Sequence, residues 1–80
     1  MTPDQIKTLI EDHLADCNAD VYSDDNTHFE ATVVCKGFAG KRPLQRHQMV
    51  YAALGEKMGG EIHALSIKAL TPEEAGSVSG

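Results

Sequence analysis

The side chains best suited to metal or redox chemistry are four histidines and two cysteines among 80 residues. Neutral imidazole binds iron, copper and zinc, and thiolates bind soft metals. His28 stands at the start of one alternating segment and His63 near the start of another. Cys17 and Cys35 lack CxxC spacing, and no arrangement with the histidines matches a zinc motif. On these residues alone, a histidine held by backbone hydrogen bonds is the commoner outcome, and a metal site is the alternative.

The cysteines and the other two histidines favour structural roles. Cys35 alternates in phase with apolar residues, so we expect a small buried side chain. The first residues do not form a signal peptide, so we expect a cytoplasmic protein with Cys17 and Cys35 as reduced thiols, and a structural disulfide between them is the alternative. His13 lies near the end of a predicted helix and complements its dipole, and His47 lies on an apolar helical stripe.

A basic cluster surrounds a short glycine motif. Residues 37–40 read Gly-Phe-Ala-Gly, the GxxG pattern of KH-domain loops that hold nucleic-acid backbones. The flanking basic residues are Lys36, Lys41, Arg42 and Arg46. They could contact phosphates or an acidic partner, although a solvated face is the commoner outcome for such a run. The net charge of −5 argues against binding nucleic acid through overall charge but leaves a local patch possible.

Catalysis is not expected. Ser66 and His63 have opposite parity within one predicted strand, and no glycine-rich phosphate loop follows a strand. No set of nucleophile, base and orienting group can be assembled. A length of 80 residues, with 41% hydrophobic and 24% charged residues, indicates one ordinary folded domain.

The elements that must position these residues follow from their periodicity and from helix-start signals such as Thr2-Pro3-Asp4-Gln5. In chain order we predict a helix to about residue 15, strands over 20–23 and 28–36, a helix over 43–58, a strand over 61–69 and a short helix from 71. The predicted apolar stripe of the second helix is Leu44, His47, Val50, Tyr51, Leu54 and Met58.

This order predicts an α/β (α+β) fold. The first two strands form a hairpin, and a strand reached across a helix normally lies parallel to the earlier strand through a right-handed crossover. We therefore expect a three-stranded mixed sheet with helices on one face, one domain over residues 1–75, and a disordered tail over 76–80.

Three segments together resemble BolA-like proteins over nearly the whole chain. They are residues 38–51 (FAGKRPLQRHQMVY), residues 62–73 (IHALSIKALTPE) and the Thr-His-Phe run at 27–29. The resemblance implies a compact α-β-β-α-β-α domain related to the type II KH fold. It also implies a non-catalytic adaptor that pairs with a monothiol glutaredoxin and shares a [2Fe-2S] cluster, in iron–sulfur and iron homeostasis and stress response.

The same resemblance assigns the candidate ligands. His63 matches the family's histidine ligand near the start of the last strand, and histidine in place of thiolate raises a cluster's potential. The second ligand comes from the loop joining the first two strands, where His28 is the only soft donor in residues 23–28. Because the partner would share the cluster, no cofactor is expected in the isolated protein. Some family members are described as DNA-binding regulators, so DNA binding through the basic cluster is the alternative function.

Overall fold

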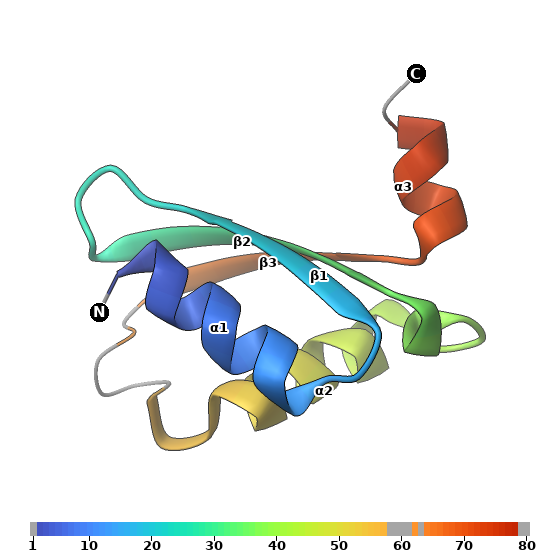
Figure 1. Ribbon diagram of the computed structural model, residues 1–80, viewed down its shortest axis with the longest axis horizontal. Coiled ribbons are helices and arrows are strands. Elements are labelled where there is room, and N and C mark those ends of the chain that lie inside the picture. Colours follow the sequence, from blue (N-terminus) through green and yellow to red (C-terminus); the bar gives the residue numbers. More distant parts are fainter. Residues whose placement is uncertain (1, 58–61, 63, 79–80) are drawn as a thin grey trace.

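A computed structural model describes residues 2–57, 62 and 64–78 of the chain. The elements in order are α1 (Pro3–His13), β1 (Cys17–Tyr22), β2 (His28–Cys35), the 3-10 turn η1 (Lys36–Phe38), α2 (Pro43–Leu54), the 3-10 turn η2 (Gly55–Lys57), β3 (Ala64–Leu70) and α3 (Pro72–Val78). The predicted order of helices and strands is confirmed (Figure 1).

The three strands form one mixed sheet in the order β1-β2-β3. β1 and β2 are an antiparallel hairpin, and β3 lies parallel to β2 after the crossover through α2. α1 and α2 lie together against the sheet, whereas α3 rises from the end of β3 away from them (Figure 1). The α+β fold class and the mixed sheet are therefore confirmed, and the expected one-sided placement holds for the two longer helices but not for α3.

The core fills the space between the sheet and the two longer helices. Ile6 and Ile10 of α1 are fully buried, as their spacing on one helical face requires. The strands contribute every second residue, as the alternation of β2 predicted: Ala19, Phe29, Ala31, Val33 and Cys35. The opposite residues of each strand face away from α1 and α2, which leaves a solvent-facing side of the sheet.

Reciprocal hydrogen bonds begin two of the helices where the sequence predicted caps. The Gln5 backbone N–H donates to the Thr2 hydroxyl, and the Gln5 side chain accepts from the Thr2 N–H at 2.9 Å. Thr71 and Glu74 repeat this pattern at α3, with the Thr71 N–H donating to Glu74 Oε1 at 2.8 Å. Each pair satisfies backbone donors that a helix start would otherwise leave unbonded.

Several boundaries differ from the predicted ones. β1 begins at Cys17, three residues before the predicted start, because its first residues pair with the far end of β2. α2 ends at Leu54, and Gly55 follows with a φ of +57° that ordinary side chains avoid. α3 runs to Val78, three residues beyond the predicted end of the domain at residue 75. The predicted helix end at 58 and the final residues 79–80 lie outside the described residues.

The predicted apolar stripe of α2 is only half right. Val50 and Leu54 are buried as expected, but Leu44 is 69% exposed and Tyr51 is 41% exposed. The buried face instead includes Ala53. The face of α2 that meets the core is therefore rotated away from Leu44 and Tyr51, which the spacing of apolar residues alone did not reveal.

Candidate metal-ligand site and basic surface

The loop between β1 and β2 presents His28 to solvent. The His28 side chain is 74% exposed, and its Nδ1 lies 3.0 Å from Oδ2 of Asp25. A carboxylate oxygen can only accept, so in the neutral form of the ring this contact favours the proton on Nδ1, which leaves the Nε2 lone pair directed elsewhere. A metal-binding histidine commonly has its second ring nitrogen bonded to a carboxylate in this way.

Asp25 also fixes the shape of this loop. Its Oδ1 accepts the backbone N–H groups of Thr27 and His28, each at 2.9 Å, and the Ser23 hydroxyl donates to the same atom. These bonds favour the ionised carboxylate and hold the pKa of Asp25 well below its usual range, with the His28 backbone N–H as the largest cause and the His28 ring next. The sequence pattern was searched in this loop only for soft metal donors, so Asp25 was not singled out as a partner of His28.

The start of β3 lies beside the start of β2. In the parallel register His28 pairs with Ala64, and Phe29 pairs with Leu65. A shallow hollow beside His28 is also lined by Tyr22, Asp24, Glu30, Ala64 and Ser66. His63, the predicted first ligand, lies outside the described residues, and it directly precedes Ala64 in the sequence.

The strand alternation does not continue from β3 back to Ile62. Ile62 is fully buried in the core, and Leu65 packs against the same core although it is three residues away. A regular strand would place residues three apart on opposite faces. The alternation of residues 65, 67 and 69 therefore does not extend to Ile62, and the predicted parity of position 63 lies outside the described residues.

Within the described residues, the candidate metal ligands do not form a cluster. No three histidine, cysteine, aspartate or glutamate side chains gather as a metal-binding group within residues 2–57, 62 and 64–78. His13 bonds locally, with Nδ1 2.9 Å from the Leu9 carbonyl oxygen, as suits its position in the last turn of α1. An exposed imidazole oriented by a carboxylate can complete the ligand set of a metal that another molecule brings.

Arg46, one of the four predicted basic binding residues, is committed to contacts within the molecule. Its Nη1 donates to the Ala69 carbonyl at 3.0 Å and to Glu74 Oε1 at 2.7 Å, and its Nε donates to the Lys41 carbonyl at 2.9 Å. The guanidinium carbon lies 5.8 Å from the centroid of the buried Phe38 ring. The side chain is only 12% exposed. Arg46 thus joins α2 to β3 and α3, which makes it unsuitable for binding phosphate.

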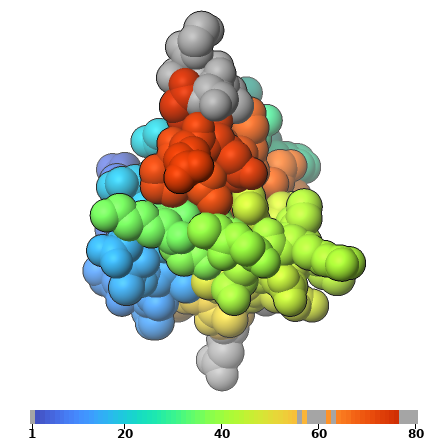
Figure 2. Space-filling model, turned by 90° about the vertical axis from the view of Figure 1, so that its right-hand side faces the viewer, coloured from blue at the N-terminus to red at the C-terminus, as the bar shows by residue number. Residues whose placement is uncertain are grey.

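The other three basic residues remain at the surface. Lys36, Lys41 and Arg42 are exposed on the segment that leads from β2 into α2. Gly40 has a φ of +76°, so the second glycine of the GxxG sequence is required by the backbone of this turn. Phe38 is fully buried, so only part of the motif is accessible. Figure 2 shows this green segment as a continuous band beneath α3.

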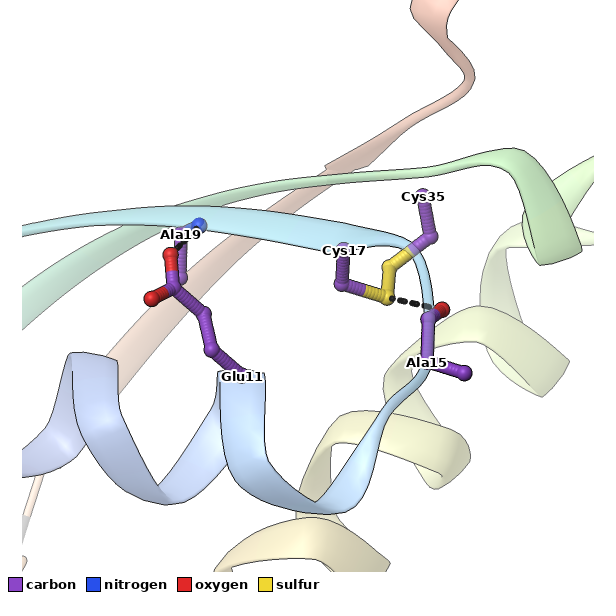
Figure 3. The surroundings of a disulfide bond; sticks show 5 residues. All are labelled: Glu11, Ala15, Cys17, Ala19 and Cys35. Atoms are coloured by element: carbon purple, nitrogen blue, oxygen red, sulfur yellow. Dashed lines mark hydrogen bonds between the residues drawn. A yellow bond between two sulfur atoms is a disulfide. The ribbon is translucent and has the colours of Figure 1, made fainter.

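The structure corrects the prediction of reduced thiols. Cys17 and Cys35 form a disulfide between the first residue of β1 and the last residue of β2, with their Cα atoms 4.2 Å apart (Figure 3). The physical reason is the hairpin register, which places the two residues directly opposite one another. Cys35 is fully buried, as its alternation predicted.

Comparison with known proteins identifies the family. The family model for BolA-like proteins matches residues 4–74. A solved BolA homologue from Coxiella burnetii is 43% identical, with a TM-score of 0.87 over 95% of this chain and 97% of the other. The chain therefore belongs to the BolA-like family.

Curated relatives carry two kinds of name. Human "BolA-like protein 1" is 54% identical over 60% of this chain and 35% of its own length. A Vibrio cholerae relative, 44% identical over 60% of this chain and 45% of its own length, is named "DNA-binding transcriptional regulator BolA". The chain thus spans between a third and a half of the length of these relatives.

The cellular location stays a prediction. "Protein BOLA1, chloroplastic" from Arabidopsis thaliana is 38% identical over 90% of this chain and 48% of its own length, so the name of one relative gives a compartment other than the cytoplasm. In the part of the chain that the structure describes, no helix combines the length and hydrophobicity needed to cross a membrane.

Proposed function

We propose that this protein is a non-catalytic BolA-type adaptor that completes the ligand set of a [2Fe-2S] cluster carried by a monothiol glutaredoxin. His63 and His28 would hold the cluster from this side, and the partner's thiolates would hold it from the other. A bound cluster would supply electron-transfer or cluster-donating chemistry, and the proposed cellular role is iron–sulfur and iron homeostasis in the cytoplasm.

The pairing of His28 with Asp25 is the observation that carries this proposal. The carboxylate accepts from Nδ1 at 3.0 Å, so Nε2 of an exposed ring is available to a metal. A neutral imidazole suits iron, and a carboxylate partner increases its basicity as a ligand. An exposed loop histidine without such an orienting group would be a weaker candidate.

The parallel register supports the pairing of the two histidines. His28 pairs with Ala64, and neighbouring strands lie about 4.8 Å apart. His63 directly precedes Ala64 in the sequence. Two ligands from adjacent strand starts suit one half of a shared site, because the partner needs to contact only one end of the sheet.

The experiment is titration of this protein into a cluster-loaded monothiol glutaredoxin, followed by visible absorption and circular dichroism. The spectrum of the cluster should change progressively as wild-type protein is added, until the change reaches a plateau. His63→Ala and His28→Ala should each reduce or abolish that change. His13→Ala is the matched control, because this exposed histidine lies on α1 and should leave the titration unaltered. A His63→Ala spectrum identical to the wild-type spectrum would remove the ligand assignment.

DNA binding is the second candidate function. Lys36, Lys41 and Arg42 are exposed around the GxxG turn, and one relative is named a DNA-binding transcriptional regulator. Replacing Lys41 and Arg42 by glutamine should weaken binding to duplex DNA and lower the salt slope by about one for each phosphate that is no longer neutralised. Arg46 is excluded from this test because its replacement would disturb α3. Binding that does not depend on salt would contradict this function.

A further inference from the structure

We propose that the Cys17–Cys35 disulfide is a thiol-exchange site in which Cys17 is the sulfur attacked by a small thiol. The bond, drawn in Figure 3, joins the pair of residues at the end of the β1–β2 register. This end of the hairpin is the one farthest from its turn. Its two sulfurs have different surroundings, and that difference carries the inference. It is independent of the proposed cluster-binding function.

Access separates the two cysteines. Cys35 is fully buried, within the apolar cluster that contains Phe38, Val33 and Ile10. Cys17 is only partly buried, at the surface end of β1 where α1 has ended. Thiol–disulfide exchange requires the attacking sulfur to approach along the disulfide, so an external thiolate reaches Cys17 and not Cys35.

The exchange can be written as two balanced steps. A thiolate RS⁻ attacks Cys17 Sγ, the Cys17–Cys35 bond breaks, and Cys35 leaves as a thiolate that takes up a proton. A second RS⁻ then attacks the R sulfur of the mixed disulfide, which releases RSSR and leaves the Cys17 thiolate to be protonated. The protein disulfide is reduced to two thiols, and two small thiols are oxidised to one disulfide.

The surroundings of each sulfur set the behaviour of the intermediate. An apolar site disfavours the Cys35 thiolate, so Cys35 leaves the disulfide slowly. After it has left, its sulfur lies beside the mixed disulfide on Cys17 and can attack it before a second small thiol does. The mixed disulfide on Cys17 therefore reverts readily when Cys35 is present. Once reduced, the Cys17 thiol has an acceptor in place, because its Sγ lies 3.4 Å from the Ala15 carbonyl oxygen (Figure 3).

The decisive experiment compares two single variants, each treated with oxidised glutathione and followed by intact mass. Cys35→Ala, which retains Cys17, should gain one glutathionyl group. Cys17→Ala, which retains the buried Cys35, should react at least about tenfold more slowly. Far-UV circular dichroism checks that both variants are folded. Equal rates, a faster Cys17→Ala variant, or an unreactive Cys35→Ala variant would each overturn the assignment.

A second measurement uses the unaltered protein. Wild-type protein is mixed briefly with reduced glutathione, acid-quenched and alkylated, and its peptides are mapped by mass spectrometry. Any trapped mixed disulfide should lie on Cys17, with the alkyl group on Cys35. The reverse distribution would contradict the proposal, as would wild-type protein that carries two free thiols after air oxidation.

Discussion

His28 Nδ1 and Asp25 Oδ2 lie 3.0 Å apart in the turn between the first two strands. The same carboxylate accepts backbone N–H groups of the turn through its other oxygen, Oδ1. One side chain therefore determines both the shape of the loop and which imidazole nitrogen is available outside it. An exposed histidine without this carboxylate would have neither a preferred ring orientation nor a preferred nitrogen for binding a metal.

Removing the charge of Asp25 should change the tautomer of His28. In the wild-type protein at a pH where the ring is neutral, the proton should reside predominantly on Nδ1, because a carboxylate accepts it there. In Asp25→Asn this predominance should disappear, as measured by long-range ¹H–¹⁵N NMR of the ring. Asp24→Asn is the control and should leave the tautomer unchanged. The same ring spectrum in wild type and Asp25→Asn would show that the carboxylate does not orient the ring.

The loop should resist mild acid. The pKa of Asp25 is lowered in the folded state by the N–H groups of His28 and Thr27, so the ionised form is the one that stabilises the loop. That stabilisation is fully present above the ordinary aspartyl pKa of 3.8 and disappears only as the pH falls through the lower folded value. The carboxyl carbon shift of Asp25 should therefore remain that of a carboxylate at pH 3.8. A half-completed titration there would contradict the hydrogen-bonded geometry.

Reducing the disulfide should lower the stability of the fold without changing its topology. Cys17 and Cys35 are 18 positions apart, and the chain-entropy relation gives about 3 kcal/mol for a loop of this size. Urea unfolding with and without a reductant measures this difference as a shift in midpoint. The Cys17→Ala/Cys35→Ala protein serves as the control, since reductant should not alter its midpoint.

Arg46→Lys should destabilise the protein by about 1–2 kcal/mol. A lysine ammonium cannot reproduce the planar set of donors that reaches the carbonyls of Lys41 and Ala69 and the carboxylate of Glu74. Arg42→Lys provides a matched comparison at an exposed position, where the change in unfolding free energy should stay within about 0.5 kcal/mol. Equal effects of the two substitutions in urea titrations would contradict the structural role assigned to Arg46.

Local patterns predicted the elements well where the signal was short-range. The cap of α1 and the alternation of β2 follow from residues that lie within a few positions of each other in the chain. The start of β1 could not be found this way, because Cys17 joins the strand only through its pairing with Cys35. Extending the predicted strands symmetrically from residues 23 and 28 would have placed Cys17 opposite Val34, whereas the observed register, in which Tyr22 pairs with Glu30, places it opposite Cys35.

Contacts between distant elements account for the other differences. Arg46 looked like a surface charge because its partners, Ala69 and Glu74, lie 23 and 28 residues further along the chain. Leu44 fits the helical spacing but lies outside the area that the core covers. Asp25 is a different case: a turn aspartate just before a candidate ligand is a local signal, and it could have been recognised as an orienting group.

The sulfur bridge also gives the hairpin a mechanical property. Residues 17–35 form a covalent ring, which the chain enters from α1 and leaves towards α2 at the same point. Tension applied between the two ends of the oxidised protein would pass through the two sulfurs and bypass the turn between Tyr22 and His28. A single backbone cut within that turn would likewise leave the molecule in one piece.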